Sequence, residues 1–569
     1  MTRNSESRFS HLPGVEIERS KFKRPFQHKT TFNAGELIPI FCDEVLPGDT
    51  FSMDMASLVR MSTPIFPTMD NAFLDTYFFF VPNRLLWEHW KEFNGENSSG
   101  YWTQQFEYQI PQVFSPNDST GDSVGWQKGD LADYFGIPTK VPGLSVNALP
   151  FRAYCLIWNE WFRDQNTMQP AYFNKSDSDV KGISYAEMVL NETTSFDDVL
   201  INALYGAKPL PVSKYHDYFT STLPQPQKGP AVDLPLYQDN IPVFTGPFND
   251  RAPSDVPLTF DAVGHTELYG TLGFKDIGNY NLQLSPVDSN TQTQLMSGGF
   301  SPNNLYADVS NVAVATISQL RQAFQLQRLY EKDARGGTRY REILKMHFGV
   351  DSPDARQQVP EYLGGKRIPI NIDQVLQTSS TDAISPQGNT AAYSMTSDID
   401  SSFTKSFTEH GYIIGVCCVR TEHTYQQGIE RMWSRKNRFD FYWPALAHIS
   451  EQAVLVKEIY AQGNEFDDDA FGYQEAWADY RYKPSRVSGA MRSNYDQSLD
   501  TWHYADFYTG GNNTFVLNAD WLAETKNNID RTLAVPSSTE DQFIADFYFD
   551  LTCVRPMPLY SVPGLIDHY

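Results

Sequence analysis

The stretch AFLDTYFFFVP, residues 72–82, decides the fold class of this chain. It is short, rich in residues that favour strands and closed by a proline, so it predicts a buried β-strand and not a helix. The segment before it, TTFNAGELIPIFCDEVLPGDTFSMDM at residues 30–55, alternates apolar and polar positions and is interrupted by Pro47 and Gly48. That pattern predicts a strand, a turn and a second strand, as in an all-β protein.

Two later stretches have the same character. GYIIGVCCVRTEH at residues 411–423 and QFIADFYFDLTCVRPMP at residues 542–558 are short, alternating and aromatic, like strands of a β-sandwich. Helical periodicity is confined to three islands between these strands, at residues 84–93, 148–164 and 316–333. We therefore predict an all-β core, with strands toward both ends of the chain and helical and loop insertions between them.

The segment 229–308 differs from the rest, because prolines and glycines separate short apolar pieces and acidic residues dominate. We expect it to be an ordered surface projection, and we expect the polar stretch 377–402 to be an exposed loop. The predicted organisation is a basic N-terminal arm (1–30), a first part of the core domain (31–228), the projecting insertion (229–308) and a second part of the core domain (309–569).

The formal net charge is −24, from 45 basic and 69 acidic residues, which excludes a protein that coats nucleic acid over its whole surface. No apolar stretch is long enough for a membrane span, and the first thirty residues contain no signal-like apolar segment. The cysteines are odd in number and scattered, so they predict neither a disulfide framework nor a CxxC metal site: Cys42, Cys155, Cys417, Cys418 and Cys553.

Motifs for catalysis are missing from the sequence. The fragment LGGKR at residues 363–367 lacks the first glycine and the hydroxyl of a phosphate-binding loop, and neither a GxSxG nor an HExxH motif occurs. Cys417 and Cys418 are adjacent, so in a strand they point to opposite faces and are poor joint zinc ligands. We predict no enzyme activity and no cofactor.

One pair of carboxylates needs separate consideration. Glu160 and Asp164 are four residues apart on the predicted helix 148–164 and would share a face, which a glycosidase pair requires. Arg152 and Arg163 lie on the same predicted helix, so an ion-paired surface is the favoured interpretation.

Two clusters combine cations with aromatic rings, which is the combination found in protein surfaces that bind single-stranded DNA. The first is RSKFKRPFQHK at residues 19–29, and the second is ERMWSRKNRFDFYW at residues 430–443. The alternative for both is a salt-bridged protein surface. The candidate DNA contacts are Arg19, Lys21, Lys23, Arg24, Arg435, Lys436 and Arg438.

Six longer runs carry a family resemblance. They are FFFVPNRLLWEHWKEFNGEN (78–97), NALPFRAYCLIWNEWFRDQN (147–166), KYHDYFTSTLPQPQKG (214–229), FGYQEAWADYRYKPSRVSGAMRS (471–493), SLDTWHYAD (498–506) and RPMPLYSVPGLIDHY (555–569). Together they resemble the major capsid proteins of the Microviridae, a family of bacteriophages with single-stranded DNA, in its gokushovirus-like branch.

This resemblance implies an eight-stranded antiparallel jelly roll of the viral capsid type. It also implies a homo-oligomer of about sixty copies, a T=1 icosahedral virion shell around circular single-stranded DNA. The implied partners are a small basic DNA-binding protein, a pilot protein and a host cell-surface receptor engaged by the insertion 229–308, with assembly in the bacterial host cytoplasm. The alternative left open by the residues is a glycan-binding or glycan-cleaving β-sandwich.

Shell subunits need several moderate interfaces, and aromatic side chains dominate such contacts. The aromatic, proline-punctuated runs 471–493 and 555–569 are therefore candidates for contacts between subunits, although they could equally pack within their own subunit. The candidate residues are Tyr473, Trp477, Tyr480, Tyr482, Arg555, Tyr560 and Tyr569.

Overall fold

The structure, a computed structural model, describes residues 17–97, 107–117, 125–230, 232, 317–379, 387–388, 390–509 and 515–560, together with short strands between 243 and 307. The chain divides into two compact units. The first contains Met1–Pro226 and Asp333–Tyr569, and the second is the insertion Gln227–Lys332.

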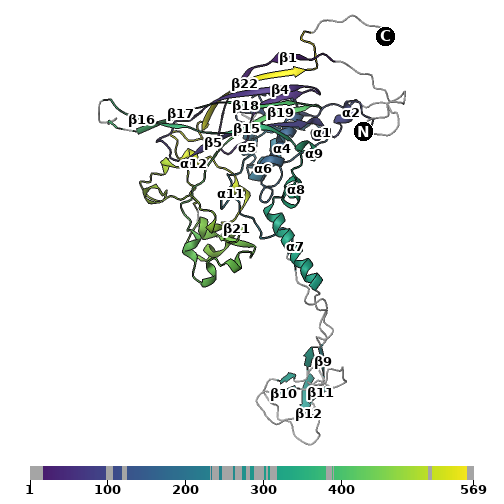
Figure 1. The fold of residues 1–569 in the computed structure, drawn as a ribbon, viewed down its shortest axis with the longest axis vertical. Helices are drawn as coiled ribbons and strands as arrows, with labels where there is room; N and C mark the ends of the chain where they lie inside the picture. Colours follow the sequence, from purple (N-terminus) through teal and green to yellow (C-terminus); the bar gives the residue numbers. More distant parts are fainter. Residues whose placement is uncertain are drawn as a thin grey trace. The chain divides into compact units, whose positions relative to one another are not determined.

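Two antiparallel sheets form the framework of the first unit (Figure 1). In the first sheet, β1 (Ser20–Lys23) and β2 (Phe26–Phe32) follow one another along one edge of β22 (Phe543–Arg555), which is followed by β4 (Thr50–Met61) and β18 (Thr396–Ser406). The second sheet has the order β15 (Glu361–Pro369), β5 (Ala72–Pro82), β19 (Gly411–Thr421) and β3 (Ile38–Val45).

The strands of these sheets pair in a nested order. Strand β2 pairs with β22, β3 with β19, β4 with β18 and β5 with β15, so pairing proceeds inward from the outermost strands toward the middle of the chain. Pro25 separates β1 from β2, and because proline lacks an N–H group it is tolerated only at such an edge.

The two sheets have different environments, which explains their different sequence patterns. Strand β22 alternates buried and exposed residues because one face of its sheet packs inward and the other is open. Strand β19 is buried on both faces, with only Arg420 partly exposed. Accordingly Cys417 packs in the core between the sheets, whereas the adjacent Cys418 packs on the opposite face against helices, so the expectation of opposite faces is confirmed.

The core between the sheets is rich in phenylalanine. The ring of Phe549 on β22 lies 4.9 Å from Phe26, 5.4 Å from Phe41 and 6.5 Å from Phe78, measured between ring centroids. Phe549 therefore joins strands of both sheets. Aromatic pairs of this kind add about 0.5–1.5 kcal/mol beyond the apolar area that they bury.

The outer face of the second sheet is covered by helices. The main ones are α1 (Asn83–Leu86) and α4 (Leu149–Ile157), which continues as a π-helical turn at Trp158–Phe162. The hydroxyl of buried Tyr154 donates to the Leu37 carbonyl at 2.7 Å and accepts from the Leu210 amide at 2.9 Å. These bonds tie the helix to two adjacent segments of chain, since the Leu37 amide itself donates to the Leu210 carbonyl.

A third core lies in the long connection between β19 and β22, residues 422–542, which we call the lobe. It contains β20 (Glu451–Leu455), α10 (Val456–Ile459) and β21 (Ala470–Glu475), packed with Tyr218 and Phe219. The remaining short elements of the first unit are α2 (Trp90–Phe93), β6 (Gln112–Phe114), α3 (Leu131–Tyr134), β7 (Ser145–Asn147), β8 (Val180–Lys181), α5 (Tyr185–Leu190), α6 (Phe196–Asn202), α8 (Tyr340–Phe348), α9 (Asp354–Gln357), α11 (Ala519–Leu522) and α12 (Asn527–Asp530).

Much of the expected projection, 229–308, lies outside the described residues. Its described strands pair as β9 (Val243–Thr245) with β14 (Leu305–Ala307), β10 (Phe260–Ala262) with β13 (Phe300–Pro302) and β11 (Leu272–Asp276) with β12 (Leu282–Pro286). Helix α7 (Ile317–Arg335) follows, which confirms the helix predicted from periodicity over residues 316–333.

Three details of the sequence prediction are wrong. The polar stretch 377–402 is not one loop, because β17 (Thr390–Ser394) and most of β18 lie within its second half. Core strands also lie in the middle of the chain and not only toward its ends. The helix predicted over 148–164 ends at Phe162 and Arg163 is extended, so Glu160 and Asp164 do not share a helical face.

Candidate functional site

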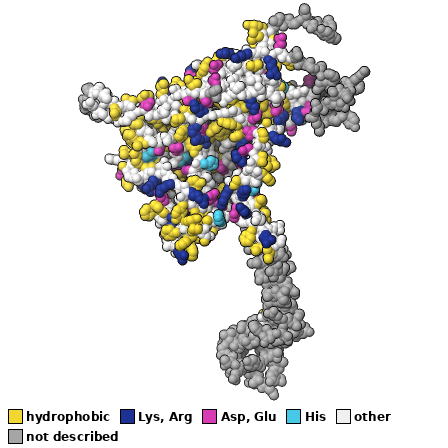
Figure 2. All heavy atoms as spheres, in the orientation of Figure 1, with side chains coloured by type: hydrophobic (Ala, Val, Ile, Leu, Met, Phe, Trp, Pro, Cys, Tyr) yellow, Lys and Arg dark blue, Asp and Glu magenta, His cyan; other side chains and the backbone are white. Residues whose placement is uncertain are grey.

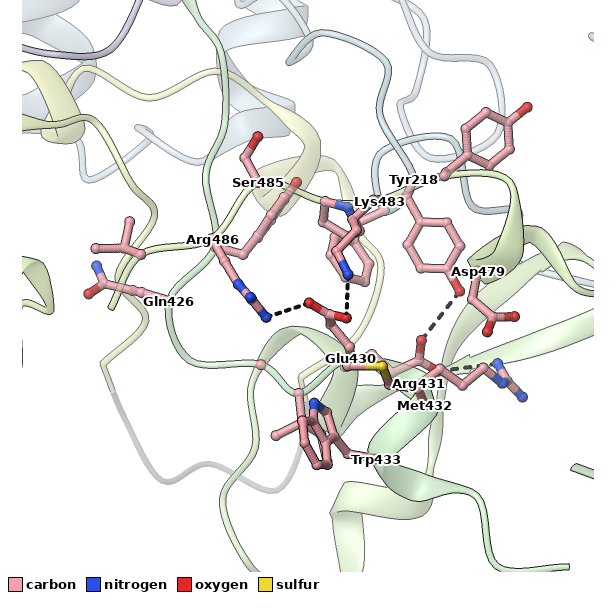
Figure 3. Close-up of a pocket in the computed structure, with 18 of the residues that line it drawn as sticks. Tyr218, Gln426, Glu430, Arg431, Met432, Trp433, Asp479, Lys483, Ser485 and Arg486 are labelled. Atoms are coloured by element: carbon pink, nitrogen blue, oxygen red, sulfur yellow. Dashed lines mark hydrogen bonds and ion pairs between the residues drawn. The ribbon is translucent and has the colours of Figure 1, made fainter. Parts of the chain in front are cut away.

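A cleft of about 370 Å³ opens on the lobe where cationic and aromatic residues meet (Figure 3). Two segments far apart in the sequence form most of it, residues 425–435 and 479–492. Their sequence patterns predict different roles, because the first belongs to a candidate DNA contact and the second to a candidate subunit contact. The residues that define its chemistry are Tyr218, Glu430, Arg431, Trp433, Lys483 and Arg486.

The mouth of the cleft has two cations for one carboxylate. Lys483 donates to Glu430 at 2.9 Å and Arg486 donates to the other oxygen of Glu430 at 2.8 Å. The hydrogen bond from Lys483 and the charges of both cations lower the pKa of Glu430. Both cationic side chains are 67% exposed, so a net positive charge faces the solvent.

The inner wall is held by a partly buried ion pair. Arg431 donates to Glu458 at 3.2 Å, and the Tyr218 hydroxyl donates to the same carboxylate at 3.3 Å. Burial raises the pKa of Glu458, although Arg431 opposes this shift. These contacts fix the inner wall of the cleft against the core of the lobe.

The second predicted cluster has both buried and exposed members. Arg435 forms an ion pair with Asp479 and stacks on Tyr480 at 4.4 Å, so its guanidinium is held within the subunit. Lys436 and Arg438 are exposed, and Arg438 lies 4.7 Å from the ring centroid of Trp443.

Large apolar side chains surround these cations. Hydrophobic and cationic side chains lie side by side over this part of the lobe (Figure 2). We call the exposed residues of 429–443 and 480–492 the basic-aromatic surface. Its exposed aromatic residues are Trp433 (72% exposed), Phe439 (70%), Phe441, Tyr442, Trp443, Tyr480 and Tyr482.

The cations of the second segment were not predicted to lie beside those of the first segment. The signal was present, since the run RYKPSRVSGAMR at residues 481–492 contains four cations and no acid. What the sequence does not reveal is the pairing through Glu430, which brings Lys483 and Arg486 beside the first cluster.

The N-terminal cluster lies on the edge of the first sheet. Arg19, Lys21 and Lys23 are exposed on and beside β1. Arg24 instead forms an ion pair with Asp43 at 2.5 Å, and this contact raises the pKa of its guanidinium. The predicted DNA contacts of the arm are therefore three available cations and one that is paired within the subunit.

The candidate contacts between subunits divide in the same way. Trp477 is 4% exposed and donates to the Leu446 carbonyl, and Arg555 pairs with Asp49 at 3.4 Å, so both act within the subunit. Tyr480, Tyr482 and Tyr560 are exposed, whereas Tyr473 is half-buried and Tyr569 lies outside the described residues.

A buried ionic network stabilises the junction of the lobe with the sheets. His423 contacts Asp506 through Nδ1 at 3.0 Å and Glu524 through Nε2 at 2.9 Å, and Lys214 pairs with Asp506 at 3.0 Å. Burial opposes a charge on His423, but the two carboxylates outweigh it and raise the pKa of His423 to about 10. His423 is therefore a cation that neutralises buried carboxylates.

No metal or membrane feature was found in the described parts of the chain. Among those residues, no three His, Cys, Asp or Glu side chains are grouped so as to hold a metal ion. No helix among the same residues has the length and apolar character needed to cross a membrane.

These features define a class of protein. Two antiparallel sheets packed face to face and carrying helical insertions form a β-sandwich of the kind used in viral capsids. The chain belongs to the capsid protein (F protein) family, whose model matches residues 10–565. The resemblance seen in the six sequence runs is thereby confirmed.

Similar proteins cover the same length. The capsid protein VP1 of Bdellovibrio phage phiMH2K is 42% identical over 100% of this chain and 99% of its own length. The capsid protein VP1 of Chlamydia phage 1 is 40% identical over 98% of both chains. That of Spiroplasma virus 4 is 44% identical over 98% of this chain and 97% of its own. These similarities confirm the gokushovirus-like branch of the Microviridae and decide against a glycan-directed β-sandwich.

Proposed function

We propose that about sixty copies of this chain close into a T=1 icosahedral shell around a circular single-stranded DNA genome. The chain is a structural capsid protein of the virion and not an enzyme. The observation that carries the proposal is the family match over nearly the whole chain, residues 10–565. A shell of this size needs only one kind of subunit in one environment.

The shell domain in this proposal is an eight-stranded jelly roll. The nested pairing supports it, because a jelly roll is a long antiparallel ribbon rolled up so that its strands alternate between two sheets. Taking β1 and β2 as one interrupted edge strand, each sheet contains four strands, in the orders β2-β22-β4-β18 and β15-β5-β19-β3.

The contacts with DNA are assigned to exposed cations. Arg19, Lys21 and Lys23 on the sheet edge and Lys436 and Arg438 on the basic-aromatic surface are available for phosphates, and the neighbouring rings are available for bases. Since the chain has a net charge of −24, a small basic DNA-binding protein would supply most of the neutralising charge.

The shell would have further partners. In this proposal the chain is organised as an N-terminal arm, a two-part shell domain and the insertion 229–308, and the insertion contacts the host receptor. Tyr473, Tyr480, Tyr482, Tyr560 and Tyr569 would contact neighbouring subunits. A pilot protein would complete the particle, and assembly would take place in the bacterial host cytoplasm.

Expression and purification of the chain test directly whether it forms a shell. We expect closed particles in electron micrographs, with a mass of about sixty subunits by light scattering. A chain that remains monomeric over a wide range of salt and protein concentration would contradict the proposal.

Replacing Arg19, Lys21 and Lys23 by serine is expected to weaken binding of the subunit to single-stranded DNA. Each lost phosphate contact lowers the slope of log affinity against log salt by about 0.7, so the slope should fall by about 2. Binding titrations at several salt concentrations measure this change. Arg24 is left in place because it pairs with Asp43.

A control variant carries the same change of charge elsewhere. Serine at Lys91, Lys181 and Lys345, which are exposed and paired with acids, should leave the salt slope unchanged. Equal slopes for the two triple variants would show that the sheet edge has no special role in DNA binding.

A further inference from the structure

The hairpin of β16 (Ile372–Leu376) and β17 forms a sheet of its own. Its two strands pair with each other and with no further strand in the described part of the chain. The hairpin extends past the ends of the large sheets (Figure 1). A two-stranded ribbon is marginally stable in water unless another surface covers it.

One face of this hairpin is apolar and exposed. Register places Asp373 opposite Tyr393 and Val375 opposite Ala391 on the same face. Burial alternates without a break from Ala391 through Ser397, so Met395 continues this face. The exposed fractions are 45% for Val375, 50% for Tyr393 and 45% for Met395. Contiguous apolar side chains of this kind mark a contact surface.

The hairpin segment is also acidic. Between Ile372 and Ser394 the sequence contains Asp373 and Asp382 and no lysine or arginine. Asp373 is exposed at the apolar face, and it forms no ion pair with any residue that the structure describes. A partner surface should therefore be both apolar and basic.

The cleft of the lobe has these two properties. Lys483 and Arg486 share one carboxylate, and the exposed rings of Trp433 and Tyr482 flank them. The residues that line the cleft include none from the hairpin. Contact between the two surfaces would therefore be made by different copies of the chain.

We propose that the β16–β17 hairpin of one copy docks into the cleft of a second copy. Tyr393 and Val375 lie against Trp433 and Tyr482, and Asp373 neutralises the Lys483 and Arg486 pair. The contact rests on the proposed shell function and names the surfaces that meet. It also covers the hairpin, which is otherwise open to water.

Charge exchange tests this contact. Asp373→Lys should reduce the yield of particles about tenfold or more, because like charges would then face each other. The matched control is Gln374→Lys, which makes a cation at the next position on the opposite face and should assemble normally. Combining Asp373→Lys with Lys483→Glu should restore particles. Normal assembly of Asp373→Lys would overturn the proposal. Failure of the double variant to form particles, when circular dichroism shows that its subunits are folded, would overturn it as well.

A second measurement does not depend on particle formation. Subunits with Asp373→Cys are mixed under oxidising conditions with subunits carrying Lys483→Cys, both with exposed Cys42 replaced by serine. A disulfide-linked dimer is expected from the mixture and from neither variant alone. Its absence would refute the docking even if particles form, whereas a dimer without particles would contradict only the shell. If Lys483→Glu particles form normally but lose DNA, the cleft binds nucleic acid and the proposal is wrong.

Discussion

Replacing His423 by alanine is expected to lower the free energy of unfolding by about 3–5 kcal/mol. The substitution removes the imidazolium that pairs with Asp506 and Glu524, and the fully buried Glu524 carboxylate keeps only the Thr421 hydroxyl as a side-chain partner among the described residues. An uncompensated buried charge is costly because it has lost its hydration. Denaturant unfolding of the purified subunit measures the effect.

The matched control is an exposed histidine pair. His89 contacts Asp177 at 2.8 Å, but both side chains are substantially exposed. His89→Ala should therefore change the unfolding free energy by no more than about 1 kcal/mol. Similar losses for the two variants would show that burial does not give the His423 network its importance.

The same network predicts a dependence of stability on pH. The pKa of His423 is raised to about 10 from an ordinary value near 6.5, so its contribution to stability is complete below the lower value. That contribution is lost as the pH rises toward 10. The difference in unfolding free energy between wild type and His423→Ala should shrink over this range, and a constant difference would contradict the assignment.

Replacing Phe549 by alanine is expected to cost about 3–5 kcal/mol of unfolding free energy. Its ring is fully buried and touches phenylalanines of both sheets, so truncation leaves a cavity where the sheets meet. Thermal and denaturant unfolding of the subunit measure the loss.

Phe26 provides the comparison for this core position. It stacks on Phe549 but is 39% exposed, so Phe26→Ala should cost clearly less. If the two substitutions cost the same, the junction of the sheets is not where the packing energy is concentrated.

Strands were predictable where burial gives a strong pattern. Strand β5 is buried almost throughout and β22 alternates cleanly, and both were found from the sequence. Strand β18 carries serine, threonine and aspartate at many positions because it is an edge strand with one open face. A polar edge strand has nearly the same composition as a loop, so periodicity does not separate the two.

The candidate site was predictable in composition but not in geometry. The cations and rings of residues 430–443 were found from their clustering, but their division into roles depends on tertiary contacts. Arg435 is held by Asp479 and Arg24 by Asp43, and neither partner is near in the sequence. Spatial pairing of distant charges is not encoded in local patterns.

The nested pairing of strands has a consequence for synthesis of the protein on the ribosome. Strand β2 is made early, yet its partner β22 begins at residue 543, so the first sheet cannot close until that part of the chain has emerged. Pairings so distant in sequence make folding slow and leave an open edge during translation. A truncated product lacking β22 would lose the strand between β2 and β4 and could not form this sheet. The topology thereby acts as a check on chain completeness before a subunit can enter a shell.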